Sequence, residues 1–248
     1  MLSTIPTTRF ARTSAPVRSL LSTGSASCWV PRIVPSSRTG LTTLQADTGV
    51  GHPYFGWLKG AIEGSQVPQQ GVITNVDALL NATEPYSFAR ALITSVTFPT
   101  LDASSLDPAQ LMVNLDLTGA TRVAASGKAG LPMKTLGWMQ KDFKFVASKF
   151  NGAGVIHVDS LTFSPNALPR LKIRLASQYA DSLRAWFEDF VIRGYNTSDK
   201  TDSMKLSFLS PSLTTLFSLE FRQVGIYMLA QSPTDSKDSM RTVEATFY

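Results

Sequence analysis

The feature that most constrains this fold is an internal repeat, because five segments recur in the same order about 130 positions apart. In each half, an alternating segment precedes a segment with helical periodicity, and three more alternating segments follow. The helical segments are 52–64 and 181–194, each with a tryptophan, Trp57 or Trp186, inside an apolar stripe. The stripes predict one amphipathic helix in each half.

The alternating segments predict β-strands, since successive residues of a strand point to opposite faces of a sheet. Those before the helices are 40–46 and 170–176. Those after the helices pair as 71–80 with 203–213, 86–98 with 216–229 and 110–117 with 240–247. We therefore expect a mainly β protein in which one fold, with one helix, occurs twice in tandem as a β-barrel or a sandwich.

The beginnings of the two halves match less well. Segment 141–163 predicts two strands around the turn signal Asn151-Gly152, whereas segment 18–34 has few strand formers. Between the halves, 119–140 has the composition of a linker. The predicted organisation is a first domain at 1–118 with a basic N-terminal arm, a linker at 119–140 and a second domain at 141–248.

Composition narrows the functional classes. The chain has 248 residues and is 43% hydrophobic, but no apolar run reaches 18 residues, so we expect no membrane span. Its one cysteine, Cys28, excludes an internal disulfide. The two histidines, His52 and His157, are too few for a histidine-rich metal centre, and we predict no metal and no cofactor.

The N-terminal segment allows two interpretations. No acidic residue precedes Asp47, and the segment is rich in Arg, Ser and Thr, which is typical of a mitochondrial transit peptide. Pro6 and Pro16 would interrupt an amphipathic helix there, which favours a basic, extended arm on a folded protein. Both interpretations remain open.

The second half, with "LPRLKIRLASQYADSLRAWFEDFVIRG", "DSMKLSFLSPSLTTLFSLEFRQVGIYML" and "DSMRTVEATF", resembles the tail tube proteins of contractile bacteriophages and related injection systems. In the first half, "FARALITSVTFPTLDASSLDPAQLMVNLDL" is similar to the closing module of the same fold. The resemblance covers 41–118 and 141–248. It departs from a simple tube subunit in having two copies in one chain and an Arg/Ser/Thr-rich beginning.

The resemblance implies a structural role in a virion tail or an injection particle. Tube proteins are β-barrels whose strands continue from subunit to subunit around a lumen. Two tube-like domains in a chain imply a ring of three chains with pseudo-sixfold symmetry at the junction of tube and spike, or a tube layer of six chains. The implied partners are neighbouring tube, sheath or baseplate proteins, with DNA or a protein as the cargo of the lumen.

Two rival functions are a monomeric, two-domain β-sandwich that binds a ligand and an imported, mitochondrial protein. Catalysis has little support in the sequence. Ser210 lacks the flanking glycines of a nucleophile elbow. Glu188 and Asp189, adjacent on a helix, should point in different directions on a solvated face. His157 and Asp159 share a strand face without a nucleophile, which favours a surface pair. We predict no catalytic residue, and we expect both tryptophans in the core.

The polar loop after the second helix is the predicted interface. It has a formal glycosylation acceptor at Asn196, and its counterpart in the first half, 65–71, is shorter. By the resemblance, loops of this type contact a neighbouring ring. The predicted interface residues are Tyr195, Asn196, Thr197, Ser198, Asp199 and Lys200. The scattered basic residues indicate at most a weak electrostatic attraction for nucleic acid.

Overall fold

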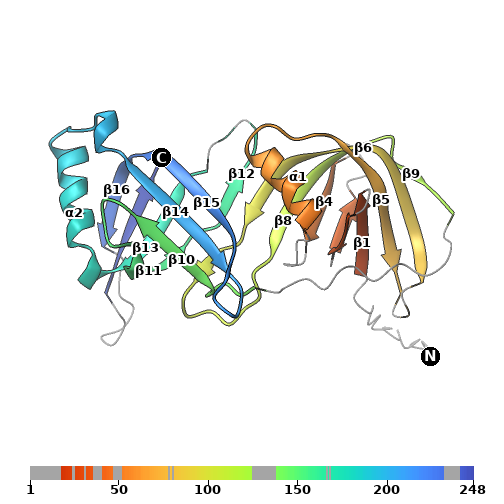
Figure 1. Cartoon of the computed structure of the whole chain (residues 1–248), viewed down its shortest axis with the longest axis horizontal. Helices are drawn as coiled ribbons and strands as arrows, with labels where there is room; N and C mark the ends of the chain where they lie inside the picture. The colour runs from red at the N-terminus through yellow and green to blue at the C-terminus, as the bar shows by residue number, and fades with distance from the viewer. Residues whose placement is uncertain are drawn as a thin grey trace, which may run out of the picture.

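The structure is a computed structural model that describes residues 18–23, 26–30, 32–35, 41–46, 52–77, 79, 81–124, 138–165, 167, 169–231 and 241–248. The basic arm expected at 1–17 and most of the predicted linker lie outside the described residues. We call residues 18–124 the first unit and residues 138–248 the second unit. The two units lie side by side along the long axis of the molecule (Figure 1).

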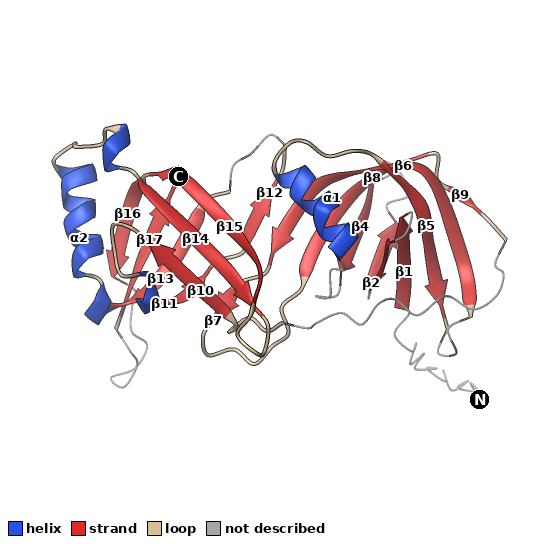
Figure 2. Ribbon diagram, in the orientation of Figure 1, coloured by secondary structure: helices blue, strands red, loops and turns tan. Residues whose placement is uncertain are grey.

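The first unit is built on an antiparallel sheet with one helix, α1 (His52–Ile62), on it (Figure 2). The sheet has nine strands, and two of them pair with β6 outside the main order. The main order is β2 (Ala26–Val30), β1 (Arg18–Thr23), β5 (Gln69–Val76), β6 (Ala82–Phe98), β8 (Leu111–Thr118), β4 (Leu41–Ala46) and β3 (Arg32–Pro35), and the two others are β9 (Thr121–Arg122) and β12 (Leu161–Phe163).

The second unit has two antiparallel sheets. One contains β10 (Phe143–Ala147), β14 (Asp202–Leu209) and β15 (Thr215–Val224). The other contains β16 (Ile226–Gln231), β17 (Thr242–Phe247), β13 (Leu171–Ala176), β11 (Val155–Val158) and β7 (Leu101–Asp102). Its helix is α2 (Asp181–Phe187), which a π turn at Glu188–Ile192 extends, and 3₁₀ turns occupy Gly152–Gly154, Ser177–Tyr179 and Ser198–Lys200.

The prediction of a mainly β fold with one helix in each half is confirmed, whereas a closed barrel is not formed by the described strands. In the first unit, the pairing order ends at β2 and β3 without a ladder between them. In the second unit, the long strand expected at 216–229 divides at Gly225 into β15 and β16, which belong to different sheets. A side chain at Gly225 would meet the ring of Tyr248, so the chain can bend tightly there.

Strand pairing repeats in the two units. The order β1-β5-β6-β8-β4-β3 recurs as β10-β14-β15, then β16-β17-β13-β11, if β15 and β16 together stand for β6. The register does not repeat at a constant offset: Leu44 pairs with Val113, whereas Val243, the counterpart of Val113, pairs with Leu175 and not with Arg174. Val113 and Val243 are both buried, so the last strands of the two units turn corresponding faces to the core although the register of the preceding strand differs by one residue.

The helices also correspond. Trp57 and Trp186 are 6% and 7% exposed, so the expectation that both lie in the core is confirmed. Gly64 and Gly194 follow the two helices, and both have a φ of 74°, a left-handed conformation that suits glycine at a helix end. The interval from tryptophan to glycine is one residue longer in the second unit. The π turn accommodates that extra residue, as π-bulges do.

The segment 141–163 forms strands on both sides of the turn, as predicted, but they do not make a hairpin. β10 pairs with β14, and β11 pairs with β13, so the turn carries the chain from one sheet to the other. The side chain of Asn151 accepts a hydrogen bond from the backbone N–H of Ala153. Gly152 is buried so closely against β10 that a Cβ would lie 2.7 Å from the carbonyl oxygen of Phe145.

We call the contact between the units the seam. Two short strands cross it: β7 of the first unit pairs with β11 of the second, and β12 of the second pairs with β6 of the first. Aromatic rings fill the seam, and Trp138, from the predicted linker, is only 1% exposed. The core is continuous across the units, and its seam rings are those of Phe98, Phe163, Phe208, Phe217 and Trp138.

Candidate interaction site

The predicted interface residues, Tyr195–Lys200, form an exposed loop after the π turn, at the end of the second unit that points away from the first (Figure 1). The indole N–H of Trp186 donates a hydrogen bond of 3.0 Å to the carbonyl oxygen of Lys200, which ties the loop to the helix. A hydrogen bond from Thr197 lowers the pKa of the Asp199 carboxyl below its usual value. The loop is therefore exposed and anchored to the helix by a hydrogen bond. Its role as an interface stays a prediction.

Apolar side chains stand exposed beside this loop. We use the name outer end for α2, its π turn, the loop and the adjoining strand β16. Ile192 is 69% exposed and Tyr195 is 58% exposed, although both are large. β16 is the last strand of its sheet, and no described strand pairs with its other edge. An unpaired strand edge beside exposed apolar side chains is able to add a strand from another chain.

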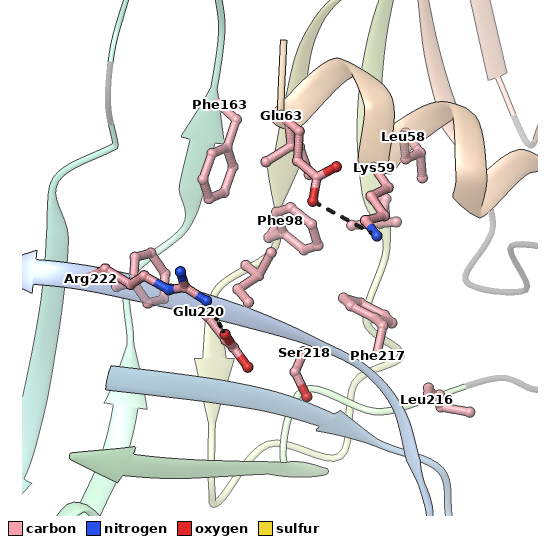
Figure 3. A pocket seen from close by; sticks show the side chains of 14 residues that line it. Leu58, Lys59, Glu63, Phe98, Phe163, Leu216, Phe217, Ser218, Glu220 and Arg222 are labelled. Carbon is pink, nitrogen blue, oxygen red and sulfur yellow. Dashed lines mark hydrogen bonds and ion pairs between the residues drawn. The ribbon is translucent and has the colours of Figure 1, made fainter. Parts of the chain in front are cut away.

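A groove of about 560 Å³ runs between α1 and β15, where the two units meet (Figure 3). On the helix side it is lined by Leu58 and Ile62, and by an ion pair of 3.8 Å between Lys59 and Glu63. Phe98 and Phe163 also line the groove. On the strand side it is lined by residues of β15, namely Leu216, Phe217, Ser218, Leu219, Glu220, Phe221 and Arg222.

A polar cluster crosses the seam on another face. The Nδ1 atom of His157 lies 3.2 Å from a carboxylate oxygen of Asp102, and its Nε2 atom lies 3.0 Å from one of Asp159. The prediction of a surface pair is wrong for His157, whose side chain is only 11% exposed because β7 covers it, although Asp159 is half-exposed. A hydrogen bond from the Ser104 hydroxyl, followed by the effects of His157, lowers the pKa of Asp102.

The cluster continues along the sheet through Lys172. Its Nζ atom lies 2.8 Å from Glu244 and 3.9 Å from Asp159, and the hydrogen bond with Glu244 raises the pKa of the ammonium group. These contacts join β7, β11, β13 and β17. The contact between Asp102 and His157 crosses the seam, so the cluster helps to join the two units.

The other residues that sequence reasoning weighed as catalytic have structural surroundings. Ser210 is buried and hydrogen-bonds to Ser212 and Thr214 in the turn between β14 and β15. Glu188 and Asp189 lie on an exposed face, as expected. The expectation that they point in different directions is wrong, because both contact Arg193 across the π turn.

Neither a metal site nor a membrane helix emerges from the part of the chain that the structure describes. There, no cluster of three or more His, Cys, Asp or Glu side chains has a suitable arrangement for a metal ion. Likewise, neither described helix has the length and apolar character to span a bilayer.

Sequence reasoning missed Asp102 and Ile192. Asp102 comes to His157 from another unit, and no periodic pattern reports a contact across 55 positions. Ile192 had a signal in the sequence, since it aligns with Ile62 once the extra residue of the second helix is allowed for. No protein-family model matches the sequence, and a search of curated proteins finds no similar chain.

Proposed function

We propose that this protein is a structural component of a bacteriophage tail or a contractile injection system, where it forms a ring of the inner tube or of the junction between tube and spike. In this proposal it has no catalytic role. Its function is assembly: strands and helices at the two ends of the chain complete a ring, and the lumen passes DNA or a protein.

The observation that carries the proposal is the repeated pairing order, together with the exchange of strands at the seam. Two copies of one fold already associate edge to edge within the chain. A contact of this heterologous kind leaves an open donor end and an open acceptor end, and such ends lead to rings or filaments. An exposed edge at β16 fits this role, since monomeric proteins usually protect such edges.

The proposal favours three chains in a ring. Three chains of two units each give six similar units, as in the pseudo-sixfold ring that the resemblance implies. A layer of six chains remains the alternative stoichiometry. Neighbouring tube, sheath or baseplate proteins would stack above and below the ring, and the loop Tyr195–Lys200 is our candidate for that contact. The virion tail or the injection particle is then the place where the protein acts.

Imaging the purified full-length chain by negative-stain electron microscopy tests this function. We expect rings with a central, stain-filled lumen and six similar densities around it. The images should be taken over a range of protein concentrations, because assembly depends on mass action. Isolated particles of single-chain size at every concentration would contradict the proposal and favour the monomeric binding module.

A further inference from the structure

We propose that the outer end of one chain binds the first unit of a second copy of this chain through a contact that repeats the seam. The inference rests on the proposed assembly function and deepens it by naming the two surfaces. The donor surface is the outer end, centred on Ile192. The acceptor surface is the far end of the first unit, centred on Tyr86 in β6.

The helix side of the contact follows from the two helices. Ile62 lies two residues before Gly64 and lines the groove against β15. Ile192 lies two residues before Gly194, so it is the counterpart of Ile62. The two differ in what covers them, because Ile62 packs against the core while Ile192 is 69% exposed. Val191 and Tyr195 are exposed as well, and a group of exposed apolar side chains indicates a surface that another chain covers.

The strand side follows from the registers. Gly71 pairs with Phe88 in the first unit, and Met204 pairs with Phe221 in the second. On that alignment the counterpart of Leu219, which lines the groove, is Tyr86. Tyr86 is 40% exposed and pairs with Ile73 of β5 and Arg122 of β9. The strands β5 and β9 lie at the end of the molecule opposite α2 (Figure 1).

The strand edges supply a third correspondence. At the seam, the end of β6 pairs with β12 along Val96–Phe98. In the second unit, Gln231 of β16 pairs with Val243 as Val96 of β6 pairs with Val113, and no described strand pairs with the other edge of β16. A second chain that adds a strand there would satisfy the backbone N–H and C=O groups of β16, as β12 does for β6.

The two helices carry ion pairs at corresponding positions. Lys59 and Glu63 pair on α1 where it faces the second unit. On the outer end the pair has reversed polarity, with Glu188 bonded to Arg193 at 2.8 Å. The contact between chains lacks the covalent connection that joins the two units at the seam. We expect a concentration-dependent association for that reason.

Site-directed cross-linking tests this contact. In a Cys28→Ser background, which removes the single native cysteine, Ile192→Cys and Tyr86→Cys are combined and treated with a short bis-maleimide. The two positions lie at opposite ends of one chain, so a cross-link between them joins two chains (Figure 1). We expect a ladder of covalent dimers and higher multiples on a denaturing gel. The matched control combines Ile192→Cys with Leu106→Cys, because Leu106 is 73% exposed but belongs to neither surface.

A second pair of variants tests the same contact without new thiols. Ile192→Asp should raise the apparent dissociation constant of the assembly at least tenfold, because it places a charge in an apolar contact. Leu106→Asp should leave that constant unchanged. Circular dichroism checks that both variants remain folded.

The outcomes separate this inference from the proposed function. Rings without a selective ladder, and with normal assembly of Ile192→Asp, would overturn the contact while leaving the function in place. A selective ladder in open filaments without rings would support the contact and contradict the ring. Single chains with no ladder at concentrations that saturate the cross-linker would overturn both.

Discussion

At the scale of single residues, Asp102 is one of the links between the two units. Its carboxylate accepts hydrogen bonds from Ser104 and lies 3.2 Å from Nδ1 of His157, across the seam. The Ser104 hydroxyl, and after it His157, lower the pKa of Asp102 from its ordinary value of 3.8. Because the folded-state pKa is lower than the unfolded-state pKa, ionised Asp102 stabilises the fold above pH 3.8, and this contribution is lost as the pH falls through the folded-state value.

Asp102→Asn should therefore reduce the loss of unfolding free energy that acid causes. At neutral pH we expect the variant to lose about 1 kcal/mol of unfolding free energy, the usual net value of one intramolecular hydrogen bond. As the pH falls from 3.8 through the lower folded-state pKa, at which the wild-type carboxyl becomes protonated, the difference between the two proteins should shrink. Urea unfolding from pH 7 to pH 3 measures both effects.

Asp107→Asn is the matched control, since Asp107 is an exposed carboxylate in the same loop. Its stability curve should follow that of the wild type. If Asp102→Asn kept a constant difference from the wild type down to pH 3, the role given to the ionised carboxylate would be wrong.

At the scale of elements, two glycines show opposite constraints. A Cβ at Gly152 would meet backbone atoms of β10, at 2.7 Å from the Phe145 carbonyl oxygen, where the chain turns between sheets. A Cβ at Gly56, in the middle of α1, would meet nothing within 4 Å. The turn therefore requires glycine, while the helix tolerates a better helix former.

Gly152→Ala should lower the free energy of unfolding by about 1–3 kcal/mol, because backbone cannot move aside as a flexible side chain can. Gly56→Ala should raise it by about 0.5–1 kcal/mol, the difference in helix propensity between the two residues. Denaturant titrations of the two variants measure the changes. Equal and small effects would show that the turn at Gly152 relaxes easily.

How much of the fold the sequence predicts also differs among elements. β4, β13 and the two helices lie within two residues of their expected bounds at the N-terminal side, because alternation and helical spacing are local patterns. The break at Gly225 was missed, since a continuous strand and a corner have the same alternation. The exchange of β7 and β12 across the seam was also missed, because short strands carry too few residues to form a pattern.

At the scale of the whole molecule, the chain joins two copies of one fold head to tail, so that different surfaces of the two units meet at the seam. The prediction of a repeat needed only the order of segments, and the structure adds the matching order of strand pairing. The candidate site was predicted in part: the loop Tyr195–Lys200 was chosen, whereas Ile192 beside it was not. Ile192 stands out only by its exposure in the structure. The sequence of an apolar helix stripe is the same whether the stripe packs against its own chain or against a neighbouring chain.

Native mass spectrometry of the full-length wild-type chain tests the central claim, that the joint within the chain repeats between chains. At micromolar concentration we predict a closed species with the mass of three chains, in equilibrium with single chains on dilution. A species of six chains would keep the joint and change the ring. A single chain at every concentration, up to the limit of solubility, would contradict the account.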